Sequence, residues 1–240
     1  TAGTIVVATG SRPRNPKEIP VDHEHILDSD SLLSMLYLPQ SLTVVGGGVI
    51  GCEYASIFAL LGVEVTLVDR APYPLQFMDK ELVEQFVRGL ENHGSHYFGE
   101  SQIVDVRWDG VTHVVTTLKN GTIIKSEKML VALGRQANIE DLDLEAAGIT
   151  LSDNRLIPVN QYCQTTMEHI YAVGDMVSGP ALASKAMEQG RRAVRHALNL
   201  PIGDAASTIP LGIYTIPEMA SIGLDEMGAR ERYKDPLVGR

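Results

Sequence analysis

The sequence predicts an α/β fold in which a compact β-α-β unit is inserted into a second domain. Short apolar runs typical of buried strands alternate along the chain with helical patterns. One of these strands is followed by a glycine triplet that opens an apolar helix. Further strand-like runs lie on both sides of this unit, and for this reason we expect it to interrupt another domain.

The first element expected is a short buried strand over residues 4–8, which is β-branched and apolar. The turn Thr9-Gly10-Ser11-Arg12-Pro13 ends it. A polar, proline-containing connector follows. It is expected to carry at most one short helix, over 29–38, with Ser29 or Asp30 as its N-cap.

The inserted unit is expected to begin with a strand over 42–45. The chain then passes through Gly46-Gly47-Gly48 into an apolar helix over 49–61 and returns in a strand over 64–68. A second helix is predicted over 79–93, because apolar residues recur there with helical spacing and acidic residues stand at its start.

An antiparallel β-meander is expected next. Apolar and polar residues alternate over 103–108 and 113–118, and Asn120-Gly121 predicts a tight turn into a third strand. A buried strand over 128–133 then ends at Gly134, and a loop-rich acidic stretch follows.

The last predicted elements are a short buried strand over 170–173 and a helix over 182–198. From residue 204 the chain contains prolines and glycines and closes no further domain. The chain also opens at Thr1 without a methionine and runs straight into a strand, so we expect it to be a piece of a longer protein.

Composition and charge narrow the class of partner. The chain has 20 basic and 30 acidic residues, a net charge of −10, and no cluster of Lys and Arg, which excludes nucleic acid and anionic membranes as expected partners. No apolar run approaches the roughly 18 residues that span a bilayer. Cys52 and Cys163 match no metal or disulfide spacing, which favours a reducing, cytoplasmic compartment.

Gly46, Gly48 and Gly51 have the G-x-G-x-x-G spacing of a dinucleotide-binding loop between a strand and a helix. Gly46 permits the tight turn, Gly48 lets the backbone approach a pyrophosphate, and Gly51 allows close packing of helix and strand. Asp69 ends the next strand and can accept hydrogen bonds from both ribose hydroxyls of NAD, whereas Arg70 can pair with the 2′-phosphate of NADP. The pattern predicts a Rossmann-like NAD(P) site and leaves the choice of dinucleotide open. The alternative is a glycine turn in a domain that binds no nucleotide.

Four signatures then occur in the order found in one family. They are Ala8-Thr9-Gly10, the glycine loop, Leu133-Gly134-Arg135 with Asn138, and Tyr171-Ala172-Val173-Gly174-Asp175. In these residues, which are distributed over positions 8–175 of the chain, the sequence resembles the pyridine nucleotide–disulfide oxidoreductases, which include lipoamide dehydrogenase, glutathione reductase and mercuric reductase. The resemblance implies an α/β fold with a Rossmann-like NAD(P)-binding domain inserted in a partial FAD-binding domain, of the three-layer ββα type.

The same resemblance implies four segments. Residues 1–39 would form part of the FAD-binding domain and a connector, 40–133 the NAD(P)-binding domain, 134–203 the remainder of the FAD-binding domain, and 204–240 the start of a C-terminal dimerisation domain. The runs 48–58 and 212–218 are most similar to the NAD(P) transhydrogenases of the family.

An enzyme of that branch is a cytoplasmic, homodimeric flavoprotein that passes hydride from NADPH to NAD through FAD, so its partners are small-molecule dinucleotides. The alternatives are a dihydrolipoamide dehydrogenase-type reductase and a non-catalytic dinucleotide-binding module. These 240 residues lack the first FAD fingerprint, the CxxxxC disulfide region and the C-terminal His-Glu pair. We therefore assign no catalytic residue and expect little activity from the chain alone.

The resemblance also implies cofactor contacts. Asp175 would hold the flavin ribityl chain, its alternative role being a helix N-cap. Glu53 would face the nicotinamide, its alternative being a surface acid. The other flavin contacts are expected at Thr9, Gly10, Ser11, Ala181, Leu182, Ala183 and Ser184. The other NAD(P) contacts are expected at Gly46, Gly47, Gly48, Val49, Ile50, Gly51, Asp69, Arg70, Ile103 and Gly134.

No metal site is expected. Asp22-His23-Glu24-His25 contains two histidines but lies on the connector without a third ligand at a typical spacing, which predicts a solvated loop. Cys52 falls inside the first helix of the inserted unit and is expected to be a small core residue.

Overall fold

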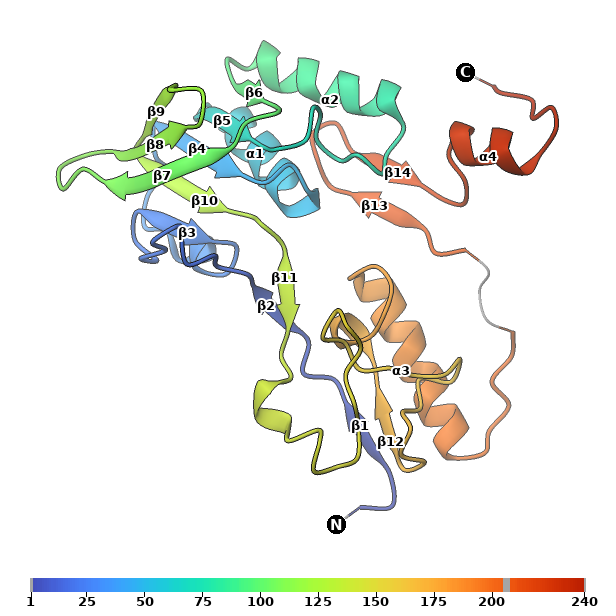
Figure 1. The fold of residues 1–240 in the computed structure, drawn as a ribbon. Coiled ribbons are helices and arrows are strands. Elements are labelled where there is room, and N and C mark those ends of the chain that lie inside the picture. The colour runs from blue at the N-terminus through green and yellow to red at the C-terminus, as the bar shows by residue number, and fades with distance from the viewer. Residues whose placement is uncertain (1, 205–207, 240) are drawn as a thin grey trace. The chain divides into compact units, whose positions relative to one another are not determined.

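The computed structural model describes residues 2–204 and 208–239. The chain divides into two compact units (Figure 1). The first comprises Thr1–Arg12 and Arg135–Ile209, and the second comprises Pro13–Gly134 and Pro210–Arg240.

The second unit is built on a five-stranded parallel sheet. Its strands are β3 (Ile26–Asp28), β4 (Ser41–Val45), β5 (Glu64–Val68), β6 (His96–Phe98) and β10 (Lys128–Val131). Their order is β3-β10-β4-β5-β6, so the chain reverses its direction across the sheet between β4 and β10. In parallel sheets, ligands bind outside the carboxyl ends of the strands at such a reversal.

Two other layers cover this sheet. Helices α1 (Val49–Leu60) and α2 (Lys80–Asn92) form one layer, and the antiparallel meander of β7 (Ile103–Trp108), β8 (Val114–Leu118) and β9 (Ile123–Ser126) forms the other (Figure 1). The α/β fold and the three-layer ββα arrangement predicted from the sequence are confirmed for this unit.

The alternation of side chains along the strands explains the three layers. In β4, Leu42 and Val44 are buried in the core beneath the helices, whereas Val45 is buried in the core beneath the meander. Thr43 points to the meander side, where its hydroxyl lies 2.7 Å from that of Ser126 in β9. Successive strand residues face opposite sides, so one apolar run supplies both cores.

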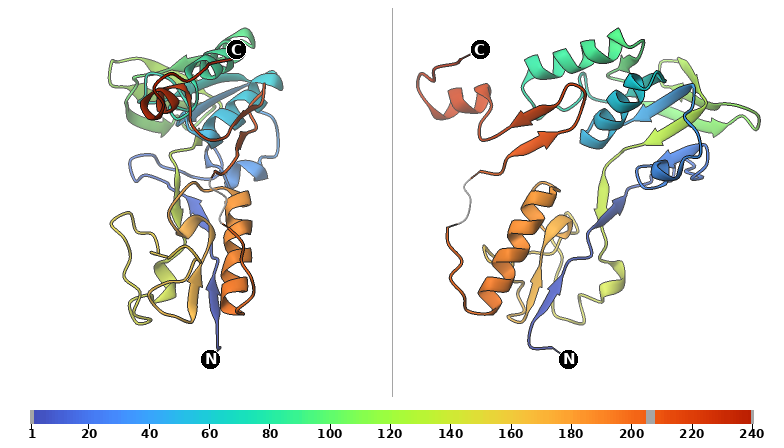
Figure 2. Two further views of the ribbon diagram at one scale, coloured as in Figure 1. Left: turned by 90° about the vertical axis from the view of Figure 1, so that its right-hand side faces the viewer. Right: turned by 180° about the vertical axis from the view of Figure 1, so that it is seen from behind.

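The first unit contains a two-stranded parallel sheet of β1 (Ile5–Val7) and β12 (Ile170–Ala172). Helix α3 (Ala183–Ala197) runs beside these strands, as Figure 2 shows from two further sides. Two short strands, β2 (Ser11–Pro13) and β11 (Arg135–Ala137), also pair with each other. Throughout the described part of both units, no helix has the length and apolar character needed to cross a bilayer.

The prediction of a helix over 29–38 is wrong. Only one 3₁₀ turn, Ser31–Ser34, forms there, and Met35 is extended. Leu33 and Leu36 are 76% and 96% exposed, so a longer helix would have no core against which to bury its apolar side. Several short elements were not expected from the sequence: β2, β3, β6, β11, the hairpin of β13 (Leu211–Ile213) and β14 (Met219–Ser221), and α4 (Glu226–Arg232).

The boundaries of the two compact units differ from those of the four segments expected from the resemblance. Residues 13–39 supply β3 to the sheet of the second unit and belong to that unit. Residues 210–240 also belong to it, because Ile213 and Met219 are buried in the core that α1 and α2 cover. The cofactors assigned to each segment stay predictions.

Candidate functional site

The glycine loop joins β4 to α1, and two of its glycines are required by packing. Gly46 has φ +110°, and a Cβ there would overlap the carbonyl oxygen of Ala132. A Cβ at Gly51 would overlap the carbonyl oxygen of Gly46. The predicted roles of Gly46 in the turn and of Gly51 in close packing therefore agree with the geometry.

Gly48 differs from both, because its backbone is ordinary and its surroundings are open. Its φ is −80°, and among the described residues nothing beyond its own chain neighbours and the adjoining helix backbone lies within 4 Å of where a Cβ would stand. The fold itself does not require glycine here. A ligand that approaches the backbone would supply the missing reason.

The start of α1 presents unpaired donors beside this open space. The first intrahelical hydrogen bond runs from the N–H of Cys52 to the carbonyl of Gly48, at 3.0 Å. Within residues 2–204 and 208–239, the N–H groups of Gly48, Val49, Ile50 and Gly51 meet no protein acceptor, and no side chain caps the helix. Free N–H groups at the positive end of a helix form a site for an anion such as a phosphate.

Asp69, directly after β5, is held against this loop. Its Oδ2 accepts a hydrogen bond from the N–H of buried Gly47, and its Oδ1 accepts one from the N–H of Ala71 at 2.7 Å. The carboxylate is thus fixed at the carboxyl edge of the sheet, while Arg70 beside it is exposed. Binding of ribose by Asp69 stays a prediction.

A cavity of about 650 Å³ opens at this edge of the sheet. The structure brings three of the predicted contacts, Asp69, Arg70 and Ile103, together in its wall. The volume lies within the usual range for sites that bind small molecules. Gly134 does not line this cavity, but its predecessor Leu133 does.

The wall of the cavity also contains a cation, Arg14, that was not expected from the sequence. Arg14 lines the wall, donates from Nε to the carbonyl of Leu133 at 3.0 Å, and donates from its backbone N–H to the carbonyl of Gly134 at 3.0 Å. No local pattern marks it, because it lies in a proline-containing connector. An arginine one residue after a strand-ending turn is the only signal in the sequence.

Glu53, predicted to face the nicotinamide, lies on α1 against the C-terminal hairpin. Its Oε1 accepts a hydrogen bond from the N–H of Tyr214 at 2.8 Å. One turn further on, the hydroxyl of Ser56 accepts another from the N–H of Ile216 at 3.1 Å. Glu53 is therefore not a solvated surface acid, and its contact with nicotinamide stays a prediction.

Three of the predicted flavin residues of the first unit, Thr9, Ser11 and Asp175, are held by hydrogen bonds. The hydroxyl of Ser11 donates to Oδ2 of Asp175 at 2.6 Å and accepts from Nε of Arg135 at 2.8 Å. The hydroxyl of Thr9 donates to the carbonyl of Asn138 at 2.5 Å. The signatures that stand far apart in the sequence thus meet where β2 pairs with β11.

The alternative role of Asp175 as the N-cap of the following helix is wrong. The N-cap of α3 is Leu182, and the carboxylate of Asp175 is engaged by Ser11 instead. Ala183 and Ser184 begin α3 with exposed side chains, so the helix start remains accessible. Contacts of this helix start with a flavin stay predictions.

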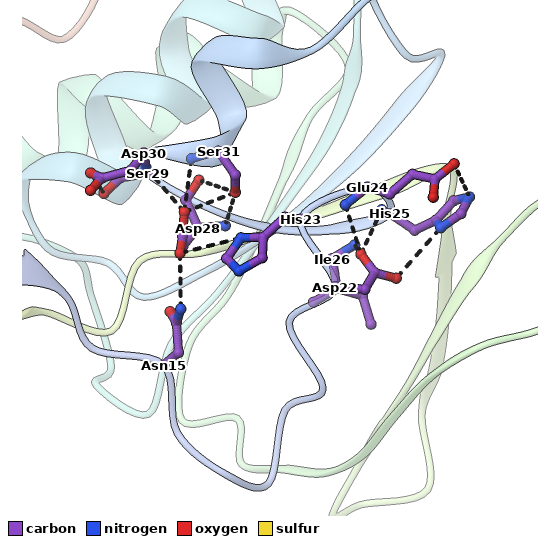
Figure 3. A network of polar contacts seen from close by, with 10 residues as sticks. All are labelled: Asn15, Asp22, His23, Glu24, His25, Ile26, Asp28, Ser29, Asp30 and Ser31. Carbon is purple, nitrogen blue, oxygen red and sulfur yellow. Dashed lines mark hydrogen bonds and ion pairs between the residues drawn. The ribbon is translucent and has the colours of Figure 1, made fainter.

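The two histidines of the connector belong to a turn held by carboxylates (Figure 3). Oδ1 of Asp22 accepts the N–H groups of Glu24, His25 and Ile26 at 2.7–2.9 Å. Nδ1 of His23 lies 3.6 Å from Oδ2 of Asp28. His25 stacks on Trp108 with ring centroids 3.7 Å apart, so it is less solvated than predicted.

No group of three or more His, Cys, Asp or Glu side chains in the described ranges is placed to hold a metal ion. Both cysteines are free and buried. Burial raises the pKa of the Cys52 thiol, as it does that of Cys163, so neither is a reactive thiolate. The prediction that Cys52 is a core residue is confirmed by its full burial.

Residues 1–190 match the family of pyridine nucleotide-disulphide oxidoreductases, and the chain belongs to this family. The resemblance inferred from the four sequence signatures is confirmed.

Two relatives with known names share about 40% of the residues of this chain. The soluble pyridine nucleotide transhydrogenase of Mycobacterium bovis (strain BCG / Pasteur 1173P2) is 43% identical over 229 residues, which cover 95% of this chain and 48% of that protein. The transhydrogenase of the same name from Pectobacterium atrosepticum is 40% identical over 232 residues, covering 94% of this chain and 48% of the relative. The chain therefore spans about half the length of these relatives.

Solved structures agree with the fold. The crystal structure of LpdA from Mycobacterium tuberculosis superposes with a TM-score of 0.89 at 30% identity, covering 95% of this chain and 50% of that one. The HOCl-induced flavoprotein disulfide reductase RclA from Escherichia coli superposes with a TM-score of 0.86 at 26% identity, covering 95% and 53%.

Proposed function

We propose that the second unit binds NAD(P), with the pyrophosphate at the start of α1 and the adenosine in the neighbouring cavity. The observation that carries this proposal is the set of unpaired N–H groups at Gly48, Val49, Ile50 and Gly51, next to a glycine that the fold alone does not require. The cavity that contains Asp69 adjoins this loop and has room for an adenosine.

The first unit is proposed to hold part of FAD. The turn at Thr9, Gly10 and Ser11 and the carboxylate of Asp175 are already fixed by hydrogen bonds, so they would meet the flavin without further ordering. When bound, FAD would supply a hydride carrier between one nicotinamide and a second acceptor. The residues of this chain would bind and orient the two cofactors.

The whole protein is proposed to be a cytoplasmic, homodimeric transhydrogenase that transfers hydride from NADPH to NAD through FAD. The names of relatives at 43% and 40% identity support this activity. A flavin-dependent disulfide reductase of the dihydrolipoamide dehydrogenase type is the second candidate, because RclA carries the name of a disulfide reductase. In isolation, residues 1–240 would act as a dinucleotide-binding module with little turnover.

The deciding experiment uses a protein of the relatives' full length that contains this chain. It is mixed with NADPH and thio-NAD, and the reduction of thio-NAD is followed by absorbance. A transhydrogenase reduces thio-NAD at the expense of NADPH with no thiol or disulfide present. Turnover only when lipoamide is supplied would identify the disulfide reductase instead, and nucleotide binding with no turnover in either assay would leave the binding module.

A further inference from the structure

We propose that Arg14, on the connector before the parallel sheet, determines specificity by binding the 2′-phosphate of NADP(H) together with Arg70. This inference rests on the proposed function, because it assigns a role within the NAD(P) cavity. It adds a cation from outside the β-α-β unit to the residues that choose between the two dinucleotides.

The position of Arg14 is fixed by the strand that ends beside it. Its backbone N–H is held by the carbonyl of Gly134 and its Nε by the carbonyl of Leu133, each at 3.0 Å. These two bonds tether the arginine at the carboxyl end of β10, in the wall of the cavity that also contains Asp69 and Arg70. A guanidinium restrained in this way loses less entropy when it binds an anion.

The two arginines of the cavity are not neutralised by any carboxylate among the described residues. In the described part of the chain, neither Arg14 nor Arg70 has a carboxylate within ion-pair distance, although the net charge of the whole chain is −10. Arginines elsewhere do find carboxylates, at 2.7–2.9 Å: Arg12 with Glu140, Arg107 with Asp105, and Arg230 with Glu226. Because Arg14 uses only Nε, its two terminal nitrogens remain to bind phosphate oxygens.

Three carboxylates line the cavity, but two of them already have partners and therefore repel a bound phosphate less strongly. Both oxygens of Asp69 already accept backbone N–H groups, from Gly47 and Ala71, which partly offset the negative charge. Asp105 pairs with Arg107 at 2.8 Å, and Glu18 is the remaining carboxylate of the wall. The cavity can therefore accept ribose hydroxyls at Asp69 and a 2′-phosphate at the arginines, as an exchange between NADP and NAD requires.

The test measures the 2′-phosphate alone. Adenosine 2′,5′-bisphosphate and 5′-AMP are titrated into the purified 240-residue chain by calorimetry. Arg14→Gln is expected to weaken the bisphosphate by about tenfold, the size of one charge-assisted contact at a partly exposed site, and to change AMP by less than about twofold. Arg14→Lys keeps the charge but not the fork of donors and should fall between wild type and Gln.

Arg88→Gln is the matched control. Arg88 lies on α2, where it pairs with Glu84 at 3.6 Å, and it does not line the cavity. Thermal unfolding of every variant establishes that the chain is folded. The control should leave both affinities unchanged.

The outcomes separate the two proposals. If Arg14→Gln leaves the ratio of the two affinities unchanged, or weakens both probes equally, Arg14 does not read the 2′-phosphate and the inference is overturned. If folded wild-type chain binds neither probe nor NADH, the proposed nucleotide site itself is wrong. A selective loss of the bisphosphate, with AMP retained, supports both.

Discussion

The carboxylate of Asp69 accepts a hydrogen bond from the backbone N–H of Gly47, which joins the end of β5 to the glycine loop after β4. The acid predicted to bind the adenosine ribose therefore also shapes the loop proposed to bind the pyrophosphate. A second bond, from the N–H of Ala71, fixes the other oxygen of this carboxylate. Substitutions at Asp69 should consequently change the fold of the loop as well as the choice of cofactor.

Asp69→Ala is expected to do both. It leaves the buried N–H of Gly47 without an acceptor, which should lower the free energy of unfolding by about 1–3 kcal/mol. It also removes the acceptor for the ribose hydroxyls, so the affinity ratio should shift toward NADP by about tenfold while both dinucleotides bind more weakly. Urea unfolding and calorimetry with NADH and NADPH measure the two effects. An unchanged ratio would show that Asp69 is not the ribose ligand.

Substitution of the loop glycines should separate binding from stability. Gly48→Val is expected to abolish dinucleotide binding while the melting temperature stays close to that of wild type, because a side chain there meets only open space. Gly51→Ala is expected to destabilise the unit, because its Cβ would overlap the carbonyl oxygen of Gly46.

Calorimetry with NADH and a thermal melt are made for both glycine variants. Unchanged NADH affinity in Gly48→Val would remove the glycine loop from the binding site. An unchanged melting temperature in Gly51→Ala would show that α1 and the glycine loop can move apart without loss of stability.

The sequence predicted the glycine loop and the elements on either side of it well, because each of them is determined by residues close together in the chain. A strand ending in a glycine turn, a helix of 12 residues and an acid at the next strand end are neighbours along the chain, and each was placed to within a residue or so. The alternation over β4 follows from the pleat of a strand.

The sequence failed where long-range contacts decide. Ile26–Asp28 is a strand because it pairs with β10, about a hundred residues later, and three residues among prolines give no periodicity. Arg14 reaches the cavity through its bond to Leu133, which no local pattern encodes. The helix over 29–38 shortens to the 3₁₀ turn Ser31–Ser34 because Leu33 and Leu36 have no core to pack against. Directly before it, the carboxylate of Asp28 accepts the backbone N–H groups of Asp30 and Ser31 in a tight turn.

That turn predicts how stability depends on pH. Burial alone would raise the pKa of Asp28, but hydrogen bonds from Asn15 and Ser31 outweigh it and lower the pKa from 3.8 to about 2. Since the folded pKa is depressed, the carboxylate stabilises the fold above the ordinary value of 3.8, and this contribution is lost as the pH falls through about 2. The shift corresponds to about 2 kcal/mol at neutral pH.

Asp28→Asn should therefore be less stable than wild type at pH 7, and the difference should shrink as the pH falls. Urea unfolding at several pH values between neutral and acidic measures it. Glu24→Gln, on the preceding turn that Asp22 organises and exposed, is the control and should follow the wild-type curve. A constant difference at all pH values would mean that Asp28 acts by packing and not through its charge.

Glu53 gives the last prediction, because its carboxylate is committed to the C-terminal hairpin before any nicotinamide arrives. Glu53→Ala removes the acceptor of the Tyr214 N–H, so deuterium exchange over 211–216 should become about three- to tenfold faster, the value of one hydrogen bond. Glu53→Gln keeps an acceptor oxygen and should retain the slow exchange.

If Glu53 also contacts the nicotinamide, Glu53→Ala should weaken the binding of NADH but not that of AMP, which lacks that half of the dinucleotide. Faster exchange with unchanged NADH affinity would make Glu53 a residue that positions the hairpin alone, and unchanged exchange would show that the bond to Tyr214 does not hold the hairpin in solution.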